Sequence, residues 1–98
     1  MCLYTADGFE GDMKNAALAI RAYNRDKGYA VSDNGVYVYY PDEDKKTANV
    51  LINNSILYEV SDDCSSKEMD ENDELVQTIM NEGIWISIDN LGDFNYLK

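Results

Sequence analysis

The sequence predicts an α+β domain, in which an antiparallel sheet of four to six strands carries two helices on one face. Three observations lead to this prediction. Apolar residues recur at helical spacing early in the chain, short runs rich in Val, Ile and Tyr follow, and a second helical pattern comes after them. The expected order is α-β-β-β-β-α-β-β. A chain of 98 residues without an internal repeat or linker has the size of one compact domain, residues 1–98.

The first helix is expected from Asp12 to Lys27. Asp12 would be its N-cap, and Gly28 would follow its last turn. Its apolar residues fall on one stripe, which is typical of a helix that packs against another layer. The stripe consists of Met13, Ala16, Ala17, Ile20 and Tyr23.

A β-hairpin is predicted around Asn34-Gly35, because both residue types tolerate the positive φ angles of a type I′ turn. The flanking runs 29–33 and 36–40 would then pair, with Val31 opposite Val38. Successive side chains of a strand point to opposite faces, so the tyrosines of the second strand would lie on the face away from Val38.

Two further strands are expected at Thr47–Ile52 and Ser55–Val60, joined by Asn53-Asn54. The apolar run 50–52 is continuous rather than alternating. Such a run indicates either a strand covered on both faces or a short helix, and we expect the strand.

The second helix is expected to start at Lys67 or Asp70 and to end at Glu82. Ser65 followed by Glu68 matches a capping box, in which each side chain satisfies a backbone N–H at the start of a helix. The apolar face of this helix is formed by Leu75, Val76, Ile79 and Met80.

The last part of the chain predicts two strands and a turn. The residue types alternate along 84–88 in the way expected of a strand. A turn is expected at residues 89–92, and a short final strand could follow at residues 94–96.

The charge of the chain excludes several functions. Eight Lys and Arg residues against nineteen Asp and Glu residues give a net charge of −11. Direct nucleic-acid binding is excluded because it depends on basic side chains that neutralise phosphates, and anionic membranes are disfavoured for the same reason. The second half, residues 51–98, holds eleven acidic and two basic residues, so the negative charge is concentrated there.

Catalytic and metal-binding motifs are missing from the sequence. There is no histidine, no Cys-x-x-Cys pair and no glycine-rich phosphate motif. No window that starts at Asp62, Asp70 or Asp89 combines the ligand spacing of a calcium loop with its sixth-position glycine. We therefore expect neither an enzyme nor a metal or cofactor site.

The cysteines and the N-terminus indicate the compartment. No segment is apolar over the thickness of a bilayer, and residues 1–10 lack the basic start and apolar stretch of a signal peptide. The expected location is therefore the cytoplasm, where Cys2 and Cys64 would be free thiols, although spacing alone leaves a disulfide between them open.

Two features are candidates for partner binding. An acid-rich stretch lies at residues 61–74, where Lys67 is the one basic residue, and tyrosines are frequent in the predicted hairpin. Tyrosine is common at binding hot spots, but the same tyrosines could line the core. The candidate partner-binding residues are Asp62, Asp63, Glu68, Asp70, Glu71, Asp73, Glu74, Tyr37 and Tyr39.

Three functions fit these features. The first is an inhibitor that blocks a basic nucleic-acid-binding protein, such as a nuclease or a CRISPR or restriction effector, by imitating nucleic acid. In small size, acidity and lack of catalytic residues the chain resembles, as a class, phage-encoded anti-CRISPR and anti-restriction proteins. The second is an immunity or antitoxin protein that caps a basic nuclease. The third is a structural or small-ligand-binding domain, in which the acidity only keeps the protein soluble.

Overall fold

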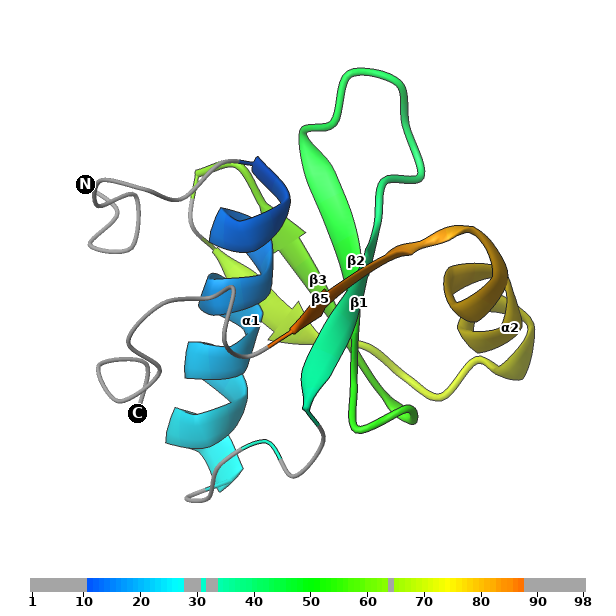
Figure 1. Ribbon diagram of the computed structural model, residues 1–98. Helices are drawn as coiled ribbons and strands as arrows, with labels where there is room; N and C mark the ends of the chain where they lie inside the picture. The colour runs from blue at the N-terminus through cyan, green and yellow to red at the C-terminus, as the bar shows by residue number, and fades with distance from the viewer. Residues whose placement is uncertain (1–10, 28–30, 32–33, 64, 88–98) are drawn as a thin grey trace.

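The computed structural model describes residues 11–27, 31, 34–63 and 65–87, and shows a five-stranded antiparallel sheet with two helices (Figure 1). The strand order is β4-β3-β2-β1-β5. The α+β class and the antiparallel sheet are confirmed, while the predicted strand 94–96 lies outside the described residues. The elements are α1 (Gly11–Lys27), β1 (Gly35–Tyr39), β2 (Thr47–Ile52), β3 (Ile56–Ser61), β4 (Ser66–Glu68), α2 (Asp73–Glu82) and β5 (Ile84–Ser87).

The helices lie on opposite faces of the sheet, so the prediction that both pack on one face is wrong (Figure 1). On β1, Val36 and Val38 belong to the core under α1. Tyr37 and Tyr39, which alternate with them, pack in a second cluster under α2. The physical reason is that the middle strands carry apolar side chains on both faces, Leu51 among them, and each face needs its own cover.

The α1 side of the sheet holds the larger core. Alanines line the inner face of α1 and are almost fully buried, which lets the helix approach the sheet closely. Tyr23 meets Tyr58 of β3 edge to face, with ring centroids 6.3 Å apart. The Tyr58 hydroxyl donates to Asp26 at 3.4 Å, and burial together with this carboxylate raises the pKa of Tyr58 to about 12.

The first helix matches its prediction except at its start. It begins at Gly11, so Asp12 lies in the first turn instead of being the N-cap. Arg25 and Lys27 occupy the last turn, where positive charge stabilises the helix dipole. Gly28 lies outside the described residues.

The predicted hairpin of residues 29–33 with 36–40 is wrong, because β1 is hydrogen-bonded to β2 on one edge and to β5 on the other. Val31 is buried in the core under α1, but the partners of Val38 are residues 50 and 84. The Asn-Gly pattern reflects only neighbouring residues. The strand that pairs with β1 at this edge is instead the apolar strand β5, which follows nearly fifty residues later. Residues 29, 30, 32 and 33 lie outside the described part of the chain.

Gly35 is a strand residue with a steric role. It pairs with Ser87 of β5, and a Cβ at this position would collide with the carbonyl oxygen of Ile86 and lie 2.8 Å from the Cα of Ser87. The close approach of β5 to β1 therefore requires glycine here.

Replacing Gly35 with alanine is expected to destabilise the protein by about 2 kcal/mol, because two backbones must move apart. Hydrogen exchange should show faster exchange of the β5 amides than in the wild type. Gly11→Ala is the control, since a Cβ there meets only the end of the Tyr40 side chain, at 3.2 Å. Equal destabilisation by both substitutions would contradict this role of Gly35.

The hairpin of β2 and β3 is confirmed. Asn53 and Asn54 both take positive φ, and the Ser55 N–H donates to the carbonyl of Ile52 at 3.2 Å. Asparagine tolerates this backbone conformation better than most residues. The strand β2 is buried on both faces, as its continuous apolar run predicted.

The predicted start of the second helix, Lys67 or Asp70, is wrong, because the helix begins at Asp73. Residues 66–68 form the edge strand β4. Ser65 does not cap a helix, because its N–H and its hydroxyl both donate to the Asp63 carboxylate. The N-cap of α2 is Asn72, whose side-chain oxygen accepts the Leu75 N–H at 3.0 Å. The helix therefore begins several residues later than expected, after β4 has added to the sheet.

Candidate functional site

All seven acidic residues singled out from the sequence are exposed, but the structure separates them into two groups. Asp62 and Asp63 lie in the turn from β3 to β4. The other five extend from Glu68, at the far end of β4, into the first turn of α2. Because β4 runs between the two groups, they occupy opposite ends of the hairpin that it forms with β3.

The first group lies in a region of mixed charge. The Asp62 N–H donates to the carbonyl of Lys46 at 2.9 Å, so this turn adjoins the loop between β1 and β2, which contains Lys45. The Asp63 carboxylate accepts the Ser65 N–H at 3.0 Å and the Ser65 hydroxyl at 2.7 Å. These hydrogen bonds lower the pKa of Asp63 and give it a role in shaping the turn.

The second group has only acidic residues, although Lys27 and Lys67 lie beside its Glu68 end. We call Asp70, Glu71, Asp73 and Glu74 the acidic segment. All four are exposed, and none belongs to an ion pair found within the described residues. Glu68 differs, since its carboxylate lies 3.2 Å from the ammonium of Lys27. Residues 68–87 contain no Lys or Arg at all, so no basic side chain interrupts the acidic segment along the chain.

The acidic segment is anchored on both sides. Before it, the Met69 N–H donates to the carbonyl of Leu57 at 2.8 Å. After it, Ile79 of α2 is fully buried against the sheet, with Leu75 and Val76 packed beside it. The Asn72 cap fixes the turn between the carboxylates. The backbone of the acidic segment is therefore held in place by the fold, which lowers the entropy cost of presenting its exposed carboxylates to a partner.

Two of these carboxylates also serve the helix itself. Asp73 and Glu74 lie in the first turn of α2, where negative side chains stabilise the helix dipole. This role accounts for two of the four charges. It does not account for Asp70 and Glu71, which precede the helix.

The two candidate tyrosines are half-buried under α2. Tyr37 meets Trp85 of β5, with ring centroids 4.9 Å apart and the ring planes at 63°. Tyr39 packs in the same cluster, whereas Tyr40 packs on the α1 side. The three therefore do not form one tyrosine patch, and the contacts of Tyr37 and Tyr39 are those of a core lined by aromatic side chains.

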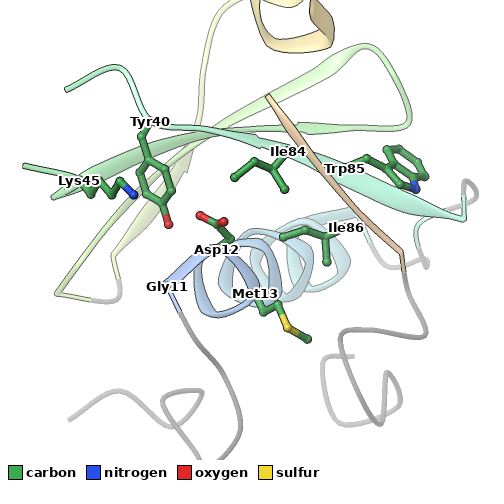
Figure 2. Close-up of a pocket in the computed structure, with 8 residues that line it drawn as sticks. All are labelled: Gly11, Asp12, Met13, Tyr40, Lys45, Ile84, Trp85 and Ile86. Atoms are coloured by element: carbon green, nitrogen blue, oxygen red, sulfur yellow. The ribbon is translucent and has the colours of Figure 1, made fainter. Parts of the chain in front are cut away.

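A groove lies between α1 and β5, which the sequence patterns did not predict. It has a volume of about 510 Å³ and an apolar part formed by Met13, Ile84 and Ile86 (Figure 2). The edge strand β5 contributes two large side chains with high exposure, Ile84 at 48% and Trp85 at 45%. The sequence signal was the uncharged run of residues 83–88, which we interpreted only as a strand.

The polar end of the groove contains a small hydrogen-bond network. The Tyr40 hydroxyl accepts from the Asn15 side-chain amide at 3.2 Å, and the Asp12 carboxylate lies beside it (Figure 2). Burial, together with the Asp12 carboxylate, raises the pKa of Tyr40 above its ordinary value. The Lys45 ammonium lies 5.3 Å from the centre of the Tyr40 ring. Figure 2 shows Asp12 between Tyr40 and the apolar side chains, with Lys45 on the other side of the ring.

Two kinds of feature are absent from the described residues, a metal-ligand cluster and a membrane-spanning helix. No three His, Cys, Asp or Glu side chains of this part of the chain are arranged to hold a metal ion. None of its helices is both long and apolar enough to cross a bilayer. Cys2 and Cys64 lie outside the residues that the structure describes.

Comparison with known proteins gives no relative for this chain: no protein-family model, no curated protein and no solved structure matches it.

Proposed function

We propose that this chain is an inhibitory binding protein, which blocks a basic nucleic-acid-binding protein by presenting carboxylates where that protein binds phosphates. The observation that carries the proposal is the acidic segment: four exposed carboxylates on an anchored stretch of chain, with no basic residue between them. A preorganised array of one sign accelerates association with a cationic groove and selects against other partners.

The described geometry supports a smaller phosphate-imitating surface than the sequence indicated. Glu68 is paired with Lys27, and Asp62 and Asp63 lie at the other end of β4. The proposed contact surface therefore consists of the acidic segment. Asp62, Asp63 and Glu68 would lie outside its centre, and Tyr37 and Tyr39 would support α2 from beneath instead of meeting the partner.

Two kinds of partner fit this surface. One is a nucleic-acid-guided or restriction effector of host defence, in which case the chain acts as phage anti-CRISPR and anti-restriction proteins do. The other is a basic nuclease capped by an immunity protein. Both have a cationic groove, and the proposal is the common mechanism, competition with nucleic acid.

The experiment is capture on immobilised protein followed by elution with nucleic acid. Proteins from a lysate are bound at low salt, and the column is washed with a polymer of the same charge but different spacing, polyglutamate, before duplex DNA or RNA is applied. We expect a nucleic-acid-binding protein to resist polyglutamate and to be released by nucleic acid. Release by polyglutamate at equal charge, or retention in the presence of excess nucleic acid, would contradict mimicry.

A further inference from the structure

Asn34 and Gly35 form the single Asn-Gly pair of the sequence, and they lie at the start of β1. Asn34 is exposed and precedes the strand pairing, which begins at Gly35 with β5 and at Val36 with β2. Its side chain makes no hydrogen bond found within the described part of the chain. Asn34 is therefore held less firmly than the strand residues that follow it.

The Asn34 side chain and the backbone nitrogen of Gly35 are placed for an intramolecular reaction. Attack of this nitrogen on the Asn34 Cγ closes a succinimide ring, while the nitrogen loses its proton and the side-chain Nδ2 leaves as ammonia. Glycine favours the step, because it has no Cβ to shield its nitrogen and its backbone angles are the least restricted of all residues. The exposure of Asn34 gives water access to the ring.

Water then opens the succinimide in one of two ways. Hydrolysis of the new bond, from the Gly35 nitrogen to Cγ, leaves aspartate at position 34. Hydrolysis of the original peptide bond leaves isoaspartate, whose main chain runs through Cβ and Cγ and is longer by a methylene group. Both products carry one more negative charge than asparagine, and water is the only co-reactant.

We infer that Asn34 is a site of deamidation in the folded protein, and that the isoaspartate product loosens the contact between β1 and β5. The second part rests on the close fit at Gly35, where even a Cβ collides with the carbonyl oxygen of Ile86. A longer main chain directly before Gly35 displaces this residue from its place beside Ser87. In the described sheet β5 pairs with β1 alone, so β5 is the strand that loosens. The inference does not involve the acidic segment.

The test is incubation of the full chain at mildly alkaline pH and physiological temperature, because the attacking species is the deprotonated Gly35 nitrogen. Anion-exchange chromatography and peptide mapping follow. We expect a more acidic form to accumulate, with aspartate and isoaspartate both mapping to position 34. Asn34→Gln should remove this form, since glutamine closes a larger and less favoured ring. Asn54→Gln is the matched control, at an exposed turn asparagine followed by Ser55, and should leave the form unchanged.

The variant Asn34→Asp separates the effect of the longer main chain from that of the added charge. It carries the same charge as the isoaspartate product on a main chain of normal length. Hydrogen exchange of the β5 amides should be faster in the purified isoaspartate form than in this variant. The amides of β3, which β2 separates from β1, should exchange equally in both.

Three results would overturn the inference. The same acidic form in Asn34→Gln would place the reaction at another residue. A chain that stays unmodified while folded and reacts only in urea would show that the fold holds Asn34 and Gly35 away from ring closure. Equal exchange of the β5 amides in the isoaspartate form and in Asn34→Asp would show that the longer main chain does not loosen β5.

Discussion

Replacing Ile79 with alanine is expected to lower the free energy of unfolding by about 3 kcal/mol. Ile79 is the one fully buried side chain of α2, and it joins Leu51 and Leu57 of the sheet in the core under that helix. Alanine would leave a cavity in the smaller of the two cores. Urea denaturation measures the loss as a lower midpoint.

Met80→Ala is the matched control for this substitution. The two residues are neighbours on the same helix, and both substitutions remove an apolar side chain of similar size, but Met80 is 39% exposed. We expect a change below about 1 kcal/mol for Met80→Ala. Equal losses for the two variants would show that α2 is not held to the sheet through Ile79.

The loss at Ile79 should also be local. Within the described residues, the α1 core shares no buried residue with the cluster under α2, so hydrogen exchange should accelerate in α2 more than in α1. Half of the acidic segment belongs to α2. Loosening this helix would therefore also weaken the binding of a partner that needs the carboxylates in fixed places.

Local patterns in the sequence were sufficient where neighbouring residues determine the structure. The apolar stripe of α1 and its end at Lys27 follow from helical periodicity and the basic last turn. The turn at Asn53-Asn54 follows from the backbone angles that asparagine tolerates. The coverage of β2 on both faces follows from its unbroken apolar run.

Long-range pairing was the part that local patterns could not determine. Asn34-Gly35 has the composition of a hairpin turn, but Gly35 is needed where β5 passes close to β1. Ser65 and Glu68 match a capping box, but backbone pairing of residues 66–68 with β3 competes with helix formation there. The cap is Asn72, which the capping-box pattern of Ser65 and Glu68 did not indicate.

The candidate site was predicted in its composition but not in its geometry. Exposure of all seven acidic residues follows from their charge. Their separation into two groups depends on β4, a short polar strand with no apolar alternation. The groove depends on β5 lying beside the start of α1, a contact between residues more than seventy positions apart.

Reversing three charges of the acidic segment is expected to weaken partner binding at least about a hundredfold, or ~2.7 kcal/mol. The variant is Asp70→Lys/Glu71→Lys/Glu74→Lys. Each substitution replaces attraction to the cationic groove by repulsion, and repulsion between like charges at an interface is costly. Lysine in the first turn of α2 opposes the helix dipole, so the neutral variant Asp70→Asn/Glu71→Gln/Glu74→Gln is measured beside it, with a smaller expected loss.

The matched control changes the net charge by the same amount elsewhere. The control variant is Asp42→Lys/Glu43→Lys/Asp62→Lys, which reverses three exposed carboxylates. Two of them lie in the loop from β1 to β2, and the third lies in the adjoining turn from β3 to β4, away from the acidic segment. Both triple variants lose the same negative charge, so any general effect of charge on association is common to them.

The most direct measurement is the ratio of the two variants' dissociation constants for the basic partner released by nucleic acid, taken at several salt concentrations. If the acidic segment imitates phosphates, the variant at Asp70, Glu71 and Glu74 loses at least about a hundredfold at physiological salt, while the control stays within about fivefold of the wild type. Equal losses in both variants, disappearing together as salt rises, would show that net charge alone attracts the partner and would contradict the account.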